Sequence, residues 1–377
     1  MKIISLGTAY PYRGGLASFN ERLAKQFSLE GHDIRIVTFS MQYPGFLFPG
    51  KTQYAKGPAP DGIKITRLIN SINPFNWIRN GLKLKKKSPD FILIKYWIPL
   101  MAPCLGTLAR IAKSNGHTKV ICIFDNVIPH EKRVGDRLLT KYFVNCIDGA
   151  VVMSNTVLED LKSFRKDIPV KFNPHPLFDN FGAAVPRNEA LSKLNLDDDN
   201  SYLLFFGFVR AYKGLDLLIE AFSDKRLRSR KLKLVIAGEF YEDDSPFKEL
   251  IKKNNLENEV VIYDRFINDD EVALFFSIAD LVALPYRAAT QSGVTQIAYH
   301  FEKPMLVTEV GGLKEIVADG KCGYVVKPEP ESIAEAIVDF YDNKKNEAFT
   351  EGVKQEKEKF SWDKMTKSIM EVYKKSL

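Results

Sequence analysis

Short runs of β-branched and aromatic residues alternate with longer amphipathic stretches along the whole chain. This alternation is typical of strand–helix–strand units that build parallel sheets, and it predicts an α/β protein with two Rossmann-like sheets. The strands predicted in the first half are Lys2–Leu6, Ile34–Phe39, Ile63–Ile69, Phe91–Lys95, Lys119–Phe124 and Gly149–Met153. Those predicted in the second half are Tyr202–Gly207, Leu232–Ala237, Val260–Tyr263, Leu281–Leu284, Met305–Thr308 and Gly323–Val326.

Helical spacing is clearest near the two ends of the chain. After Gly15, apolar residues recur at intervals of three and four, at Leu16, Phe19, Leu23 and Phe27. These positions share one face of a helix, so the segment is expected to pack on the first sheet. The segment Trp362–Tyr373 has the same amphipathic spacing and predicts a terminal helix.

A segment without periodicity separates the two halves. Residues 172–190 contain a cluster of turn-forming residues, namely Pro174, Pro176, Gly182 and Pro186. Such clusters mark loops, so we predict a hinge there. Because open parallel sheets bind ligands beyond the carboxyl ends of their strands, a ligand crevice is expected between the two domains.

Composition limits the class of protein. The 377 residues are 45% hydrophobic and 27% charged, which is ordinary globular usage for two to three domains. The longest weakly charged apolar run, Tyr96–Ala109, is shorter than the roughly 20 residues of a membrane-spanning helix. The first residues lack the apolar region of a signal peptide, which predicts a cytoplasmic protein. The four cysteines show no CxxC spacing and are expected to be buried thiols.

The net charge of +7 conceals a difference between the two halves. Residues 1–190 hold 27 Lys and Arg against 14 Asp and Glu, or +13, whereas the remaining residues hold 27 against 33, or −6. A basic half attracts phosphate, nucleic acid or an anionic membrane surface. Charge alone leaves these three partners open.

Two loops combine glycines or cations with the start of a predicted helix. Gly14 and Gly15 precede a helix whose first amides could bind an anion, although tight turns need glycines as well. Arg210 and Lys213 follow the strand that ends at Gly207. Arginine can bind two phosphate oxygens at once and lysine adds a point charge, so the pair suits a diphosphate. The alternative is that both residues are solvated cations of an ordinary loop.

A third segment, "LPYRAATQSGVTQIAYHFEKP", places a polar turn between a strand and a helix. Free amides at that helix N-terminus would form a second anion cradle. The alternative is an ordinary serine cap followed by a glycine turn. The residues of this turn are Ser292, Gly293, Val294 and Thr295.

The order of the glycine loop, "GFVRAYKG", "QSGVTQIAYHFEKP" and "VGGLKEIVADGKCGYVV" resembles glycosyltransferase family 4, which comprises retaining sugar-nucleotide enzymes of the GT-B fold. The resemblance spans nearly the whole chain and is strongest from about residue 200 to 340. It implies an acceptor-binding domain over residues 1–180, a donor-binding domain over residues 181–360, and a terminal helix, 361–377, that crosses back to the first domain. It further implies that Arg210 and Lys213 contact the donor diphosphate, with Gly15 and the Ser292–Thr295 turn closing around it.

The chain departs from the family pattern at two places. Relatives usually carry two glutamates, eight positions apart, that touch the donor sugar and the ribose, and the matching positions here are Ala289 and Ile297. Gln291 is a candidate for a polar contact with the donor in place of these glutamates. The alternative is that Gln291 is an ordinary turn residue. Relatives often show a His-Asn pair after a strand of the first domain, where this chain has Asp125 and Asn126.

Asp125 and His130 are the candidate catalytic residues of the first domain. Both follow the carboxyl end of a predicted strand, where each could orient a hydroxyl group of a sugar or acceptor. The alternative for each is a loop cap or a surface group. His175, within the predicted hinge, is expected to be structural.

No cofactor and no metal are predicted. Asp197–Asp199 contains the DxD spacing of metal-dependent glycosyltransferases, but it lies in a polar run that reads as a solvated loop. The chain has no GxSxG or HExxH motif, which argues against common hydrolases. A dinucleotide oxidoreductase is disfavoured because neither half has GxGxxG followed by an acidic residue.

The segment "NPFNWIRNGLKLKKK" mixes large apolar residues with Arg79, Lys83 and Lys85–Lys87. That composition suits a membrane surface, and a solvated basic helix end is the equal alternative.

Together the features of the sequence predict a cytoplasmic, metal-independent, retaining glycosyltransferase that uses a nucleotide-diphosphate sugar and a glycan or lipid-linked acceptor, without nucleic acid. The alternatives are an epimerase-like enzyme of the same fold and a catalytically silent glycosyltransferase-like binding subunit.

Overall fold

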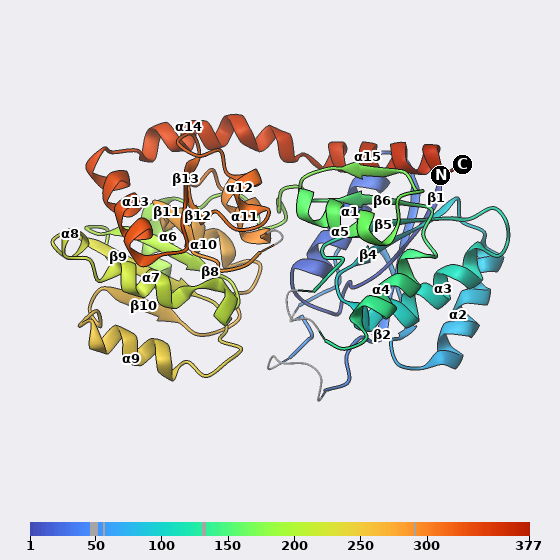
Figure 1. Ribbon diagram of the computed structural model, residues 1–377. Coiled ribbons are helices and arrows are strands. Elements are labelled where there is room, and N and C mark those ends of the chain that lie inside the picture. The colour runs from blue at the N-terminus through green and yellow to red at the C-terminus, as the bar shows by residue number, and fades with distance from the viewer. Residues whose placement is uncertain (46–51, 56, 130–132, 290–291) are drawn as a thin grey trace. The chain divides into compact units, whose positions relative to one another are not determined.

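The computed structural model describes residues 1–45, 52–55, 57–129, 133–289 and 292–377 (Figure 1). The chain forms two compact units. The first unit contains Met1–Pro176 and Ser361–Leu377, and the second contains Leu177–Phe360. The acceptor-binding and donor-binding roles assigned to these two parts of the chain stay predictions.

The first unit is built on a seven-stranded parallel sheet in the order β3-β2-β1-β4-β5-β6-β7. Its central strands are almost completely buried, as expected for a parallel sheet that helices cover on both faces. The strands are β1 (Lys2–Leu6), β2 (Asp33–Met41), β3 (Lys64–Asn70), β4 (Phe91–Tyr96), β5 (Lys119–Phe124), β6 (Gly149–Val152) and β7 (Val170–Phe172). The helices are α1 (Gly15–Leu29), α2 (Pro74–Lys87), α3 (Ala102–Lys113), α4 (Asp136–Val144), α5 (Asn155–Phe164) and α15 (Trp362–Ser376).

Strand β7 is the one strand of the first sheet that the sequence pattern misses. It has three residues, and it pairs with β6 through Ala150 and Val170 at the edge of the sheet. Phe172 is 41% exposed. An edge strand that is open to solvent does not need a continuous apolar run, so its sequence reads as part of the loop that follows.

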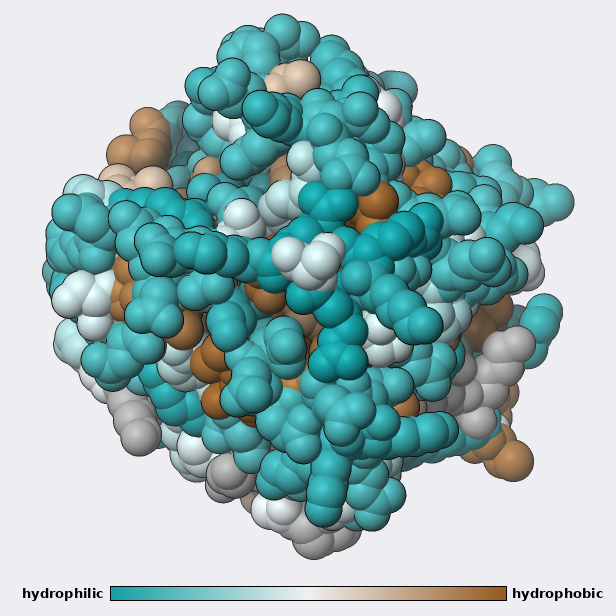
Figure 2. Space-filling model, turned by 90° about the vertical axis from the view of Figure 1, so that its left-hand side faces the viewer, coloured by the Kyte–Doolittle hydropathy of each residue, from teal (hydrophilic) through white to brown (hydrophobic). Residues whose placement is uncertain are grey.

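The second unit contains a six-stranded parallel sheet in the order β10-β9-β8-β11-β12-β13. Its strands are β8 (Ser201–Phe206), β9 (Leu232–Ala237), β10 (Val260–Tyr263), β11 (Leu281–Leu284), β12 (Met305–Thr308) and β13 (Gly323–Val326). Its helices are α6 (Arg187–Leu194), α7 (Leu215–Phe222), α8 (Lys225–Arg228), α9 (Ser245–Lys253), α10 (Val272–Ile278), α11 (Gly293–His300), α12 (Leu313–Ile316), α13 (Pro330–Asp342) and α14 (Asn346–Lys357). Figure 2, which views the molecule from the left of Figure 1, shows a mostly hydrophilic face.

Both sheets reverse their strand order beside the first strand of the unit. Strand β1 lies between β2 and β4, and β8 lies between β9 and β11. At such a switch point the connections leave in opposite directions and open a crevice at the carboxyl ends of the strands. The loops after β8 and β11 are therefore the places in the second unit where a ligand is expected.

The terminal helix α15 packs on the first unit, as the resemblance implies. The ring centres of Trp362 and Phe19 lie 5.2 Å apart, and those of Tyr373 and Phe91 lie 5.0 Å apart. A Cβ atom on Gly149 would lie 2.4 Å from Val372, so the small residue in β6 permits the close approach of the helix.

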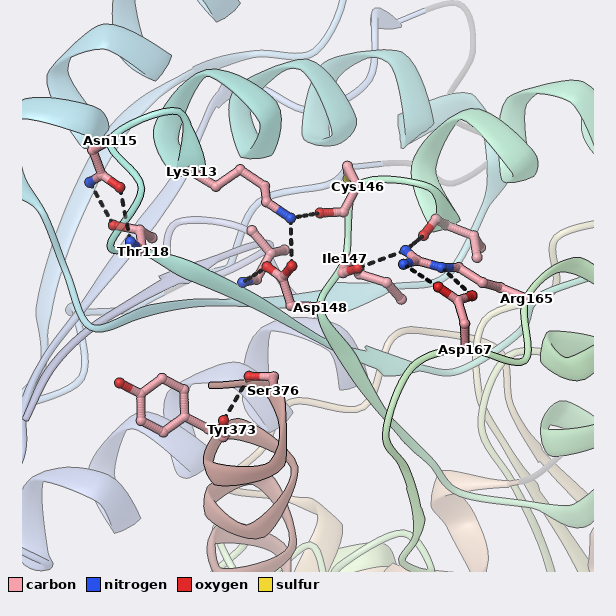
Figure 3. Close-up of polar contacts among 12 residues, drawn as sticks. Lys113, Asn115, Thr118, Cys146, Ile147, Asp148, Arg165, Asp167, Tyr373 and Ser376 are labelled. Carbon is pink, nitrogen blue, oxygen red and sulfur yellow. Dashed lines mark hydrogen bonds and ion pairs between the residues drawn. The ribbon is translucent and has the colours of Figure 1, made fainter.

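Polar contacts tie together the segments around β5 and β6 (Figure 3). Lys113 Nζ donates to Asp148 Oδ1 over 2.6 Å, and Arg165 donates to the Ile147 carbonyl over 2.8 Å. Arg165 also pairs with Asp167 over 2.9 Å. These cations of the first unit are neutralised by neighbouring carboxylates, which reduces the part of its basic excess that can act on a ligand.

Candidate functional site

The loop after β8 folds back against the end of β11. Its first residue, Gly207, donates its amide to Ala237, and a short 3-10 turn, Ala211–Lys213, follows. Gly214 has φ +65°, and a Cβ atom there would lie 2.1 Å from the Pro285 carbonyl oxygen. A side chain at this position is excluded, and the close approach of the two loops fixes the position of Lys213.

Lys213 is a buried cation at the carboxyl end of β8. The residue is only 8% exposed. A Cβ atom added to Gly207 would lie 3.1 Å from the Nζ atom of Lys213. Nζ lies 5.5 Å from the ring centre of Tyr286. Within the described part of the chain, no carboxylate oxygen lies within 4.0 Å of this ammonium group. Since a buried charge without a counterion is costly, an anion at this place would stabilise the lysine.

Electrostatics connects Lys213 to Arg210. Burial lowers the pKa of Lys213 to about 8, with a smaller contribution in the same direction from the positive charge of Arg210. The Arg210 guanidinium is half-buried and lies 5.1 Å from the ring centre of Tyr241. Two cations that repel each other at one strand end would both be stabilised by a diphosphate.

The third segment lies beside Lys213, as the resemblance to glycosyltransferases implies. The Tyr286 hydroxyl is 3.3 Å from Ser292 Oγ, and Ser292 caps the N-terminus of α11. A Cβ atom on Gly207 would lie 3.6 Å from Val294. The second and third segments of the sequence therefore meet at one place, and Tyr286 links them. The hydrophobic periodicity of the sequence does not single out Tyr286. Only its position shortly before the predicted turn indicates that it could connect the two segments.

One detail of the predicted anion cradle is wrong. The Val294 amide donates to Ser292 Oγ over 3.2 Å, so it is not free for a ligand. The Thr295 hydroxyl donates to the Ser292 carbonyl over 2.6 Å and is also occupied. A helix-capping serine satisfies amides of the first turn before any ligand arrives. Gly293 packs closely on Phe178, because a Cβ atom there would lie 2.7 Å from that ring.

Arg287, two residues after Pro285, is a neighbouring cation with a different role. It forms a bidentate ion pair with Asp216, at 2.5 and 2.6 Å, and its amide donates to the Tyr212 carbonyl over 2.7 Å. The Asp216 carboxylate raises the pKa of Arg287 further. Because its charge is neutralised, Arg287 braces the loop that carries Lys213 and is no candidate for an anion ligand.

In the first unit, Gly14 and Gly15 begin α1 as predicted. Gly14 has φ +98°, and its carbonyl accepts the amides of Ala17 and Ser18 at 3.0 and 3.2 Å. The preceding loop is held by Asn20, whose side-chain amide donates to the Thr8 carbonyl over 2.8 Å. Anion binding by this turn stays a prediction.

Asp125 lies in a buried ion pair that sequence analysis missed. Its Oδ1 atom accepts from Lys95 Nζ over 2.6 Å, and that ammonium lies 3.4 Å from the ring centre of Phe19. The nearby His175 is buried, and burial together with Lys95 lowers its pKa to about 3, so it is neutral and structural. Lys95 lies within a predicted strand, and nothing in the sequence around it indicates that it pairs with Asp125. A catalytic role for Asp125 stays a prediction.

Two candidates, His130 and Gln291, lie outside the described residues. The DxD run is exposed, with Asp198 and Asp199 at 3.9 and 3.4 Å from Arg187 and Lys231. No group of three or more residues suited to a metal occurs among the residues that the structure describes.

Comparison with known proteins identifies the family of the second unit. Residues 186–356 match the family model for glycosyl transferases group 1. This segment is a group 1 glycosyltransferase domain. It contains the loop of Arg210 and Lys213, the Tyr286 contact and the whole of α11.

Similarity to glycosyltransferases extends over nearly the whole chain. An uncharacterized glycosyltransferase of Methanocaldococcus jannaschii is 25% identical over 379 residues, which cover 99% of this chain and 98% of that protein. Among solved structures, sucrose-phosphate synthase from Thermosynechococcus elongatus has a TM-score of 0.75 at 16% identity, covering 99% of this chain and 98% of that one. Anabaena HepE, in complex with UDP, also has a TM-score of 0.75 at 16% identity and covers 99% of this chain and 100% of that one. The predicted two-domain GT-B fold is confirmed.

Proposed function

We propose that this chain is a retaining, metal-independent glycosyltransferase that moves a sugar from a nucleotide-diphosphate sugar to a glycan or lipid-linked acceptor. The observation that carries the proposal is the buried, uncompensated ammonium of Lys213 beside Arg210 in a group 1 glycosyltransferase domain. A diphosphate supplies the negative charge that this pair of cations lacks. The cytoplasmic location predicted from the sequence belongs to the same proposal.

The two cations would act on the leaving group. When the bond between the sugar C1 and the diphosphate oxygen breaks, the electron pair stays on the diphosphate and its negative charge grows. Arg210 and Lys213 would bind this charge more strongly in the transition state than in the ground state, which lowers the barrier. The acceptor hydroxyl attacks C1 on the face that the diphosphate leaves, and its proton passes to the departing phosphate oxygen. This route retains configuration and needs no protein nucleophile.

Solved structures of the same fold support a nucleotide-diphosphate donor. Anabaena HepE was solved with UDP and with UDP-glucose, and a starch synthase from Arabidopsis thaliana was solved with ADP and acarbose. The bases of these nucleotides differ, so we propose the donor class only. Gly14, Gly15, Gln291 and the Ser292–Thr295 turn, without the Val294 amide, are the further donor contacts in this proposal. Asp125 and His130 are its acceptor-orienting residues.

A catalytically silent binding subunit is the second candidate, because Ala289 and Ile297 stand where relatives usually have glutamates. The decisive experiment measures the thermal stability of the full chain with a panel of nucleoside diphosphates and their sugars, followed by product analysis with the best donor. A bound ligand raises the unfolding temperature by mass action. We expect stabilisation and, with an acceptor, release of nucleoside diphosphate with transfer of the sugar. Stabilisation without turnover over a broad acceptor panel would favour the silent subunit, and a changed sugar on intact nucleotide would favour the epimerase.

Activity should survive removal of divalent metal. In this proposal Arg210 and Lys213 neutralise the leaving diphosphate, which is the task of the metal ion in metal-dependent transferases. Turnover is measured before and after treatment with a chelator, and again after addition of magnesium or manganese. Loss of turnover on chelation, with recovery on adding metal, would contradict the role assigned to the two cations.

A further inference from the structure

Helix α2 of the first unit has one buried face and one exposed face. Asn80, Gly81 and Leu84 are buried, and a Cβ atom on Gly81 would lie 2.8 Å from Ile111 in α3. The Trp77 indole donates to the Asn70 carbonyl over 2.7 Å, and Asn73 caps the start of the helix. These contacts fix the helix about its axis, so its outward face is set by the fold.

Large apolar side chains lie on the outward face. Phe75 is 84% exposed, Ile78 is 47% exposed and Leu82 is 55% exposed. Their spacing of three and four residues places them in one row along the helix. An exposed leucine alone needs no explanation, but three such residues in one row, on the face opposite a well-packed one, mark an interaction surface.

Cations border this apolar row. Arg79, Lys83 and Lys86 are exposed and lie on one side of the row, roughly 50° to 110° around the helix from it. In the described residues, no carboxylate oxygen lies within 4.0 Å of these cations or of Lys85 and Lys87. The sequence has no acidic residue between Asp61 and Asp90. Lys113, on the adjacent α3, is by contrast paired with Asp148.

We propose that α2 docks the first unit on an anionic lipid surface. Phe75, Ile78 and Leu82 enter the boundary between headgroups and acyl chains, while Arg79, Lys83 and Lys86 bind headgroup phosphates. A row of apolar residues flanked by unpaired cations is the pattern of a helix that lies in the plane of a membrane surface. No helix among the described residues has the length and hydrophobicity needed to cross a bilayer, so the docking is peripheral. This inference is independent of the proposed transferase activity.

The apolar row is what favours lipid over a polyanion. Nucleic acid and acidic polysaccharide attract lysine and arginine through their charges, but they offer no apolar phase to Ile78 and Leu82. A lipid surface rewards both components, the cations through its negative potential and the apolar side chains through burial.

The test is co-sedimentation of the full chain with vesicles of phosphatidylcholine, with and without phosphatidylglycerol, at low and high salt. We expect binding to the anionic vesicles at low salt and much weaker binding to the neutral ones or at high salt. Failure to bind anionic vesicles at low salt, or equal binding to both compositions, overturns the proposal.

Two variants separate charge from insertion. The triple variant Arg79→Ala, Lys83→Ala, Lys86→Ala should weaken binding by about a hundredfold, at about fivefold for each cation. The double variant Phe75→Ser, Leu82→Ser keeps all cations and should weaken binding at least tenfold through lost apolar burial. The matched controls are Lys225→Ala, Lys252→Ala, Lys253→Ala in the second unit and Leu29→Ser in α1, all at exposed positions, which should bind like the parent chain.

Thermal melts establish that each variant is folded. If the loss of cations abolishes binding while Phe75→Ser, Leu82→Ser has no effect, the surface binds a polyanion and the lipid proposal is wrong. Heparin in place of vesicles then identifies that class. If both variants weaken binding and their controls do not, α2 is the docking helix.

Discussion

Alanine in place of Arg210 is expected to slow turnover at saturating donor by about a hundredfold or more. Loss of one electrostatic group that acts on charge developing in a transition state typically costs about 3–4 kcal/mol. The affinity for the donor should fall less than the rate, because the diphosphate carries more charge on the reacting oxygen as the bond breaks. Lysine at this position should rescue only part of the rate, since it keeps the charge but loses the bidentate contact of a planar guanidinium.

The measurement is the rate at saturating donor, with donor affinity determined separately, for Arg210→Ala and Arg210→Lys. Arg226→Ala is the matched control, because Arg226 is an exposed arginine of the same unit whose ion pair with Asp224 lies at the surface. Its loss should leave the rate unchanged. A near-normal rate in a well-folded Arg210→Ala variant would assign the chemistry to other residues and favour the solvated-loop interpretation.

The strands of both sheets were largely predictable because a parallel sheet imposes a simple sequence pattern. Strands buried on both faces must be apolar along their whole length, and β5, β9 and β11 begin and end where the pattern predicts. Strand β7 escaped because an exposed edge relaxes that requirement. The helix after Gly15 was equally clear, since Phe19, Leu23 and Phe27 are all buried on the sheet.

The site was predictable as a set of loops but not as a set of contacts. Strand ends and glycines locate the loop of Lys213, yet the burial of that lysine also depends on Tyr286, which lies at the end of a different strand, β11. The ion pair of Lys95 and Asp125 joins two strands 30 residues apart in the sequence. Such pairings follow from strand order, which the order of motifs does not fix.

The burial of Lys213 leads to a second expectation, which concerns stability. Its pKa in the folded protein is about 8, against 10.5 for an ordinary lysine. Below pH 8 the lysine is charged in both the folded and unfolded states, and the folded state bears the full cost of the buried charge. That cost is about 3 kcal/mol by linkage. Methionine in place of Lys213 keeps much of the side-chain volume without the charge, so the variant should be more stable than the parent at pH 7 by up to this amount.

The pH dependence distinguishes this effect from simple repacking. Between about pH 8 and 10.5 the folded parent releases the Lys213 proton while the unfolded chain still holds it, so the parent gains stability with rising pH. Lys213→Met lacks this gain, and its advantage should shrink across that interval and vanish above it. The measurement is the free energy of unfolding in urea at several pH values for both proteins, with nucleotide absent.

The same variant should lose function while it gains stability. Without the ammonium, nucleoside diphosphate should no longer raise its unfolding temperature, and turnover should fall about a hundredfold or more. Lys231→Met is the control, since Lys231 is an exposed lysine of the same unit whose ion pair with Asp199, at 3.4 Å, lies at the surface. A Lys213→Met variant that is less stable than the parent at pH 7 would mean that an internal partner already compensates this charge. A residue whose removal stabilises the empty protein and abolishes ligand binding is kept for the ligand, because the fold alone does not benefit from it.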